Sequence, residues 1–145
     1  MDLERILRET HTVAVVGVSA NRARPSYGVY QYLKAHTDYT LYPVNPTISS
    51  GTLDGDTVYP SLADLPVVPD MVDVFRRHEE LPSVLADVLA LGGVSDPPRL
   101  PRTLWLQQGL FHEEVAREAQ DAGLQVVMDR CLKVDHDLLV RRSAR

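Results

Sequence analysis

Three features are rare or absent in this chain of 145 residues: cysteine pairs, long apolar runs and basic clusters. The single cysteine, Cys131, excludes an internal disulfide and a cysteine-based zinc site. No apolar run approaches the roughly 20 residues that a membrane-spanning helix needs. Residues 1–10 alternate charged and apolar side chains, whereas a signal peptide has a continuous apolar region. We therefore expect a cytoplasmic protein with no membrane partner.

The charge balance argues against nucleic acid as a partner. The formal net charge is -5, whereas nucleic-acid-binding domains are usually basic or carry a basic stripe. The only dense basic run is at residues 141–145, and terminal runs of this kind are typically solvated and disordered. We expect no nucleic-acid partner.

Segments with strand and helix patterns alternate along the whole chain. The strand patterns lie at residues 12–16, 39–46, 71–75, 102–106 and 124–128. The helix patterns lie at residues 1–10, 25–36, 79–90 and 111–123. Residues 92–101 contain three prolines and are expected to form a loop, and residues 136–145 a tail.

Strands separated by helices indicate βαβ units and a parallel sheet. We predict an α/β fold, with one Rossmann-like domain over residues 1–145. The sheet is expected to be mainly parallel, with five or six strands and helices on both faces. In such open sheets, ligands bind beyond the carboxyl ends of the strands. That rule selects the segments that follow the first four strands.

The segment after the first strand has the composition of a phosphate-binding loop. Gly17 lets the backbone approach a phosphate, and the helix that begins near Ser26 points its free N–H groups toward an anion. Ser19 and Ser26 supply hydroxyl donors, and Arg22 and Arg24 supply positive charge. The alternative is a tight strand-to-helix turn with two solvated arginines.

The end of the second strand distinguishes between cofactors. A site for NAD places Asp or Glu there to accept from the ribose, and a site for NADP favours arginine. This strand ends instead in Val44, Asn45 and Pro46, and Ser19 occupies the second glycine position of the dinucleotide fingerprint. An ordinary nicotinamide dinucleotide site is therefore disfavoured, although Asn45 and Pro46 also fit a simple strand-ending turn.

The third and fourth strands end in side chains suited to an extended polar ligand. Phe75 can cover an adenine or a pantetheine arm, and Arg76 or Arg77 can contact a phosphate. The alternative is that Phe75 belongs to the core and the two arginines are surface residues. Gln107 and Gln108 supply amides for hydrogen bonds to polar ligand groups or to a neighbouring loop.

No residue pattern indicates catalysis. Cys131 lies between Arg130 and Lys133, which would favour a thiolate, but a lone cysteine after a buried strand is more often a packed apolar residue. His78 and His112 have no nucleophile or acid partner at a recognisable spacing, and the other three histidines look peripheral. No metal-ligand pattern occurs in the sequence. We expect neither catalytic nor metal-binding residues.

Five motifs, in order, resemble the small bacterial and archaeal CoA-binding proteins: VAVVGVSANRARPSYGVYQYL, YPVNP, VDVFRR, LWLQQG and VVMDRCLK. That family is similar to the N-terminal nucleotide-binding domain of the succinyl-CoA synthetase alpha subunit. The resemblance covers roughly residues 10–135 and implies coenzyme A, or an acyl-CoA, as the ligand. The loop at residues 92–101 is longer and richer in proline than the family pattern.

The resemblance also implies a set of ligand-binding residues. Together with the residues chosen above from the strand ends, the expected ligand-binding residues are Gly17, Val18, Ser19, Ala20, Arg22, Arg24, Ser26, Tyr27, Asn45, Pro46, Phe75, Arg76, Arg77, Gln107, Gln108 and Gly109. The turn at residues 17–20 and the arginines after it would meet the pyrophosphate and the ribose phosphate.

Three functions follow from these observations. The first is a non-catalytic sensor, carrier or accessory protein that binds CoA or an acyl-CoA, with a homodimer as one expected assembly. The second is an oxidoreductase or regulator that binds NAD(P) or another nucleotide. The third is one subunit of a heteromeric acyl-CoA ligase, whose phosphate-carrying histidine and nucleotide-binding domain would lie on other chains.

Overall fold

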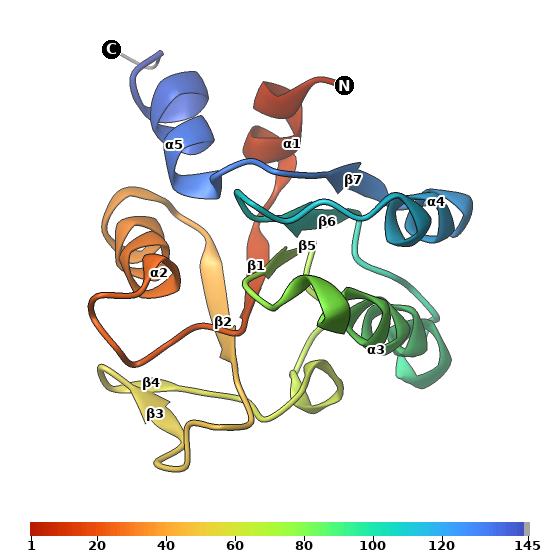
Figure 1. The fold of residues 1–145 in the computed structure, drawn as a ribbon, viewed down its shortest axis with the longest axis horizontal. Helices are drawn as coiled ribbons and strands as arrows, with labels where there is room; N and C mark the ends of the chain where they lie inside the picture. Colours follow the sequence, from red (N-terminus) through yellow and green to blue (C-terminus); the bar gives the residue numbers. More distant parts are fainter. Residues whose placement is uncertain (144–145) are drawn as a thin grey trace.

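The computed structural model describes residues 1–143, which form a parallel sheet covered by helices on both faces (Figure 1). The sheet contains β1 (Thr12–Val16), β2 (Thr40–Val44), β5 (Met71–Val74), β6 (Thr103–Leu106) and β7 (Gln125–Val127). Their order across the sheet is β2-β1-β5-β6-β7, and every neighbouring pair is parallel. The predicted α/β class, the parallel sheet and its five strands are confirmed.

The helices form two layers. On one face of the sheet lie α1 (Leu3–Glu9), α2 (Pro25–His36) and α5 (Leu132–His136), and on the other lie α3 (Leu81–Val94) and α4 (Glu113–Asp121). Short 3-10 helices, η1 (Leu62–Asp64) and η2 (His78–Glu80), precede β5 and α3 respectively, and the π-helix η3 (Asp137–Arg141) follows α5. A hairpin of β3 (Thr52–Leu53) and β4 (Asp56–Thr57) lies after β2.

The strands are buried on both faces, which explains their continuous apolar sequences. Side chains alternate between two cores. Val16, Val74 and Leu106 belong to the core under α3 and α4. Val15 and Trp105 belong to the core under α1, α2 and α5. Because Val16, Val74 and Leu106 are also register partners, β1, β5 and β6 end at one level of the sheet.

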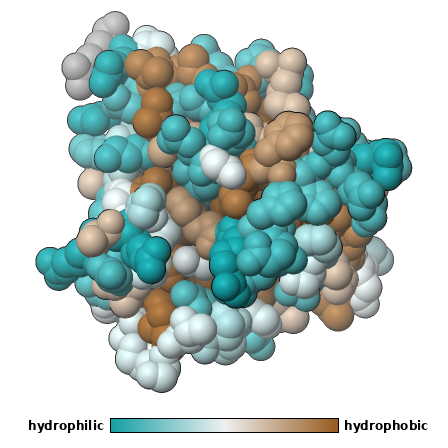
Figure 2. Space-filling view, in the orientation of Figure 1, coloured by the Kyte–Doolittle hydropathy of each residue, from teal (hydrophilic) through white to brown (hydrophobic). Residues whose placement is uncertain are grey.

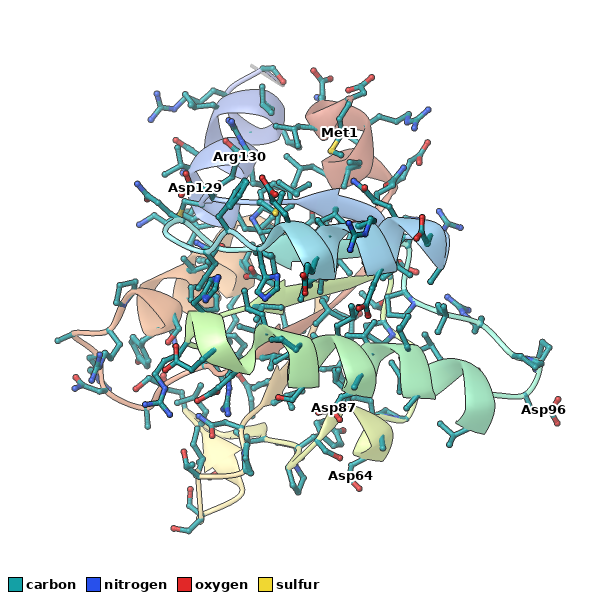
Figure 3. All side chains as sticks on the ribbon, turned by 45° about the vertical axis from the view of Figure 1, so that its right-hand side comes forward. Met1, Asp64, Asp87, Asp96, Asp129 and Arg130 are labelled. Carbon is teal, nitrogen blue, oxygen red and sulfur yellow. The ribbon has the colours of Figure 1, made fainter. Side chains whose placement is uncertain are left out.

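The helix α3 is longer than its apolar pattern predicted. It continues to Val94, so the first part of the predicted loop at residues 92–101 is helical. Glycine suits position 92, because a Cβ at this position would lie only 3.1 Å from the Leu100 Cδ2 atom. Ser95 ends the helix, and its N–H and hydroxyl both donate to the Leu91 carbonyl. Figure 3 shows Asp96 at the outer tip of the loop that follows.

The predicted tail at residues 136–145 is wrong in its first half. Residues 137–141 form η3, and Leu139 and Val140 pack against the core under α1 and α2. His136, expected to be peripheral, is buried, and its Nδ1 lies 2.9 Å from the Tyr32 hydroxyl oxygen. Three apolar residues inside a charged segment were too weak a pattern to predict this helix. Residues 144–145 of the expected tail lie outside the described residues.

Among residues 1–143, no helix is both long enough and apolar enough to cross a membrane. The face of the molecule seen in Figure 1 exposes apolar side chains near its middle, and hydrophilic side chains surround them (Figure 2).

Candidate functional site

A cleft of about 580 Å³ opens at the carboxyl ends of β1, β5 and β6. The strands β1 and β5 are neighbours in the sheet, while β2, which follows β1 in the chain, lies on the opposite side of β1. The chain therefore builds one edge of the sheet from β1 to β2 and then returns to build the other edge from β5 onward. The position between β1 and β5, where the strand order reverses, is the switch point at which α/β sheets bind ligands. The cleft is lined by Gly17, Ser19, Arg24, Pro25, Ser26, Val29, Phe75, Arg76, Arg77, Gln107, Gln108, Leu110 and Cys131.

Gly17 joins the loops that follow β1 and β5. Its φ is +87°, and a Cβ at this position would lie 2.1 Å from the Phe75 carbonyl oxygen and 2.9 Å from the Arg76 Cδ atom. The Phe75 N–H donates to the Val16 carbonyl at 2.8 Å. Glycine is thus required by the contact between the two loops, independently of any ligand.

The loop from Ser19 to Arg24 is held by its own side chains. The Ser19 N–H donates to the Ser26 hydroxyl at 3.0 Å, and the Asn21 N–H donates to the Ser19 hydroxyl at 3.0 Å. Both hydroxyls act as acceptors in these bonds, and each keeps a proton that it can donate to a ligand.

The N-terminus of α2 opens into the cleft. Its N-cap is Arg24, whose side chain makes no capping hydrogen bond, and Pro25 stands in the first turn. Within the part of the chain that the structure describes, the first turn of this 12-residue helix has no acidic residue and its N-cap side chain accepts no helix N–H. Together with the Arg24 guanidinium in the cleft wall, this helix end favours an anionic group.

Two further arginines in the cleft wall are engaged with one carboxylate. Arg76 and Arg77 both pair with Glu80, through the Arg76 Nε atom at 2.5 Å and the Arg77 Nη2 atom at 2.8 Å. Hydrogen bonding by Arg77, together with the charge of Arg76, holds the pKa of the Glu80 carboxyl below its ordinary value. Arg24 takes part in no ion pair formed by residues 1–143.

The far wall of the cleft joins β6 to α5. The buried Gln107 amide accepts the Leu132 N–H through Oε1 at 3.1 Å, which fixes the N-terminus of α5 against the strand. Gln108 is exposed. Cys131 is half-buried at the N-cap of α5 and lines the cleft. The apolar side chains of Val29 and Leu110 lie in the same lining.

A second hollow of about 400 Å³ lies on the other side of Ser19. Its lining is polar apart from Ala20 and Ile48, and includes Asn21, Asn45, Thr47, Ser49 and Ser50. Asn45 donates through Nδ2 to the Val18 carbonyl at 2.8 Å and accepts from the Thr47 N–H and hydroxyl through Oδ1. Asn45 therefore ties the loop after β2 to the loop after β1. Because Ser19 lines both spaces, a long ligand can extend from one to the other.

The structure brings most of the predicted site residues to these two spaces, but not all of them. Arg22 and Tyr27 turn away from the cleft: the Arg22 Cζ atom lies 5.8 Å from the Tyr27 ring centre, and the Tyr27 hydroxyl donates to Asp54 at 2.5 Å. Val18 is fully buried, and Pro46 lines a separate small hollow. Their roles in ligand binding remain predictions, as do those of the residues inside the cleft.

Gly109 also lies outside the lining, in a turn that the next loop holds in place. Its φ is +91°, and its N–H donates to the Asp129 Oδ1 atom at 2.7 Å. Figure 3 shows Asp129 and Arg130 together on the segment between β7 and α5. Sequence reasoning missed Val29 and Leu110 as lining residues, because a core valine on a helix and a leucine after a turn have no distinctive pattern. It considered Cys131 as a nucleophile, as a thiol that could form a mixed disulfide with CoA or as a packed apolar residue, but did not include it among the ligand-binding residues.

The two histidines considered for chemistry have structural partners. His78 and His112 stack, with ring centres 4.9 Å apart, and His112 caps α4 by accepting the Val115 N–H through Nδ1. Within residues 1–143, no three His, Cys, Asp or Glu side chains are grouped to hold a metal ion. Asp73 is fully buried in the central strand and its carboxyl oxygens have no partner, and burial raises the pKa of this carboxyl well above its ordinary value.

The family model of the CoA-binding domain matches residues 11–137 of this chain. The chain belongs to this family. It is 36% identical to the Bacillus subtilis (strain 168) protein YneT over 135 residues, which are 93% of this chain and 92% of that one.

A solved structure from Thermus thermophilus, of the protein called cell-free ID.343, shares 37% identity with this chain. It has a TM-score of 0.84 and covers 96% of this chain and 99% of its own. The fold also resembles part of the dinucleotide-forming acetyl-coenzyme A synthetase 1 of Ca. Korarchaeum cryptofilum, with a TM-score of 0.71 and 23% identity. That match covers 88% of this chain but only 27% of the synthetase, so it shows the fold alone.

Proposed function

We propose that this protein binds coenzyme A, free or acylated, in the cleft at the carboxyl ends of β1, β5 and β6, without catalysing a reaction. The observation that carries the proposal is the convergence of the α2 N-terminus, Arg24, Arg76 and Arg77 on one cleft whose remaining wall is partly apolar. Membership of the CoA-binding domain family supports the same ligand.

The two halves of CoA suit different parts of the site. Its phosphates need positive charge and N–H donors, which the α2 N-terminus and the cleft arginines supply. The pantetheine arm combines methylene groups with amides, and it suits a wall that contains Phe75, Val29, Leu110 and the exposed Gln108 amide. The polar hollow beyond Ser19 offers hydroxyl and amide groups to the nucleotide end.

A non-catalytic role is favoured by the partners of the reactive side chains. His112 uses Nδ1 to cap a helix, and Asp73 is sealed inside the sheet. The loop after β2 presents Asn45 rather than a carboxylate, and the Asn45 side chain is committed to the Val18 carbonyl and to Thr47. This arrangement does not favour a nicotinamide dinucleotide. A role as one subunit of an acyl-CoA ligase would require partner chains and would use the same CoA site.

The test is calorimetric titration with CoA, dephospho-CoA and NADH. We expect micromolar binding of CoA, weaker binding of dephospho-CoA because it lacks the 3′-phosphate, and no heat from NADH. A second readout is alkylation of Cys131 by iodoacetamide, which bound CoA should slow because the thiol lies in the cleft wall. Heat from NADH without heat from CoA would refute the proposal, and CoA binding with unprotected Cys131 would place the ligand elsewhere.

We also propose, as the sequence led us to expect, that the protein is cytoplasmic and that it forms a homodimer. Sedimentation velocity with and without CoA measures the assembly, and a single species at the monomer mass would refute the homodimer.

A further inference from the structure

The Glu80 carboxylate binds the two arginines Arg76 and Arg77 as a phosphate group would bind them. Glu80 uses both carboxylate oxygens: Oε2 forms an ion pair with the Arg76 Nε atom at 2.5 Å, and Oε1 accepts from the Nε and Nη2 atoms of Arg77 at 3.0 and 2.8 Å. One carboxylate thus binds two guanidinium groups, each of which lines the cleft.

The side chain of Arg76 is packed against the backbone, so its contact with Glu80 is better fixed than an ion pair between two fully exposed side chains. Its Cδ atom lies against Gly17, at the junction between the loops after β1 and β5. The side chains of Arg76 and Glu80 are 31% and 23% exposed, so this pair is partly shielded from water. Arg77 is 77% exposed and contacts Glu79 only at 3.6 Å.

The arginines of the cleft therefore fall into two classes. Arg24 is paired with no carboxylate among residues 1–143, so its charge is available to a ligand. Arg76 and Arg77 are neutralised by Glu80, with Glu79 nearby, so the four side chains carry no formal net charge. An incoming phosphate competes with the Glu80 carboxylate for these N–H groups and for their charge.

We propose that Glu80 is an internal counter-ion that occupies Arg76 and Arg77 in the ligand-free cleft, and that a phosphate group of the ligand displaces it on binding. This inference rests on the proposed binding of CoA. It makes Glu80 a residue that lowers affinity for phosphate-bearing ligands and holds the two arginines in the cleft wall when no ligand is bound.

The experiment compares Glu80→Gln with its neighbour Glu79→Gln. Both substitutions remove one negative charge from adjacent positions, but only the first releases both arginines. The Glu80 side chain caps no N–H of α3, and the Ser83 hydroxyl bonds the Glu80 backbone carbonyl, so the helix start is preserved. Glu80→Ala is a second variant that removes the carboxylate with a different shape.

CoA affinity is measured by calorimetry for each folded variant at low and high salt. We expect Glu80→Gln and Glu80→Ala to bind CoA roughly fivefold more tightly than the wild type, the scale of two partly exposed ion pairs. Their affinity should also fall more steeply with salt, because the released arginines carry uncompensated charge. Glu79→Gln should change affinity by less than about twofold.

Unchanged or weaker CoA binding in both Glu80 variants would overturn the inference, because Glu80 would then be a spectator or a group that orients the arginines for the ligand. An equal gain in Glu79→Gln would also overturn it, since the effect would be one of general charge. Failure of the proposed function gives a different result, namely no CoA binding by the wild-type protein.

Discussion

The two faces of the sheet differ in what they bury. The core under α3 and α4 contains only apolar side chains. The buried polar residues lie on the other side of the sheet or at its ends, where α1, α2 and α5 pack: Thr10, Ser26, Asp73, Thr103, Gln107, Asp135 and His136. The cleft also opens toward this side, between α2 and the N-terminus of α5. Both faces therefore bury an apolar core, and the face under α1, α2 and α5 also carries the buried polar groups, of which Ser26 and Gln107 line the cleft.

The largest effect should come from the apolar face. Leu85 is 2% exposed in the middle of α3, and Leu85→Ala should lower the free energy of unfolding by about 3 kcal/mol through lost burial and a new cavity. Chemical denaturation measures the loss. CoA affinity of the folded fraction should stay unchanged, and a large drop would show that the two faces are not separable.

The next effect should come from the buried acid of the polar face. The folded protein keeps the Asp73 carboxyl protonated at pH values where the unfolded chain has lost this proton, because burial raises the pKa of Asp73 above 3.8. Stability contributed by the protonated form is therefore complete below about pH 4 and is lost as pH rises toward the raised pKa. The slope for one such group is about 1.4 kcal/mol per pH unit.

Asp73→Asn removes this proton equilibrium and should be more stable than the wild type near neutral pH. Urea denaturation at pH 5, 6 and 7 should show a stability advantage that grows with pH. Asp73→Leu, which also lacks the proton, should follow the same trend. Parallel curves for the wild type and both variants would mean that the Asp73 carboxyl titrates normally.

The two arginines after β1 sharpen the comparison at the cleft itself. Arg24 lines the cleft, whereas Arg22 lies over Tyr27, away from it. Arg24→Gln should weaken CoA binding about five- to tenfold, the scale of one partly exposed charged hydrogen bond, and Arg22→Gln should have little effect. Calorimetry measures the CoA affinity of both variants. Equal losses of affinity would mean that the phosphates contact both Arg22 and Arg24.

The smallest effect concerns His136 on the polar face. Burial lowers the pKa of the His136 imidazole, so its neutral form stabilises the fold above about pH 6.5, and this contribution is lost as pH falls through the lowered pKa. In an Asp73→Asn background, which removes the opposite trend, stability should fall as pH is lowered from 7 to 5. Adding His136→Gln should reduce this loss of stability at low pH. An equal loss of stability with His136→Gln present would mean that other groups cause it.

The sheet and its order of elements could be predicted because each buried strand is a short apolar run that ends in a polar segment. The ends of elements were less predictable, since α3 continues through Gly92 and Gly93, two poor helix formers, and η3 packs against α1, which is distant in the sequence. The position of the cleft agrees with the general rule for strand ends. What could not be predicted was side-chain direction: Tyr27 does not line the cleft, and its hydroxyl donates a hydrogen bond to Asp54, in the hairpin of β3 and β4.

The contact between Gly17 and Phe75 has a consequence for the thermodynamics of binding. The Phe75 N–H donates to the Val16 carbonyl, and the Phe75 carbonyl and the Arg76 Cδ atom fill the space where a Gly17 side chain would stand, so the loops after β1 and β5 pack directly against each other. A ligand that binds at this junction meets two loops already in contact. We therefore expect association to cost mainly the conformational freedom of the ligand and of a few side chains, and little of that of the backbone at Gly17 and Phe75.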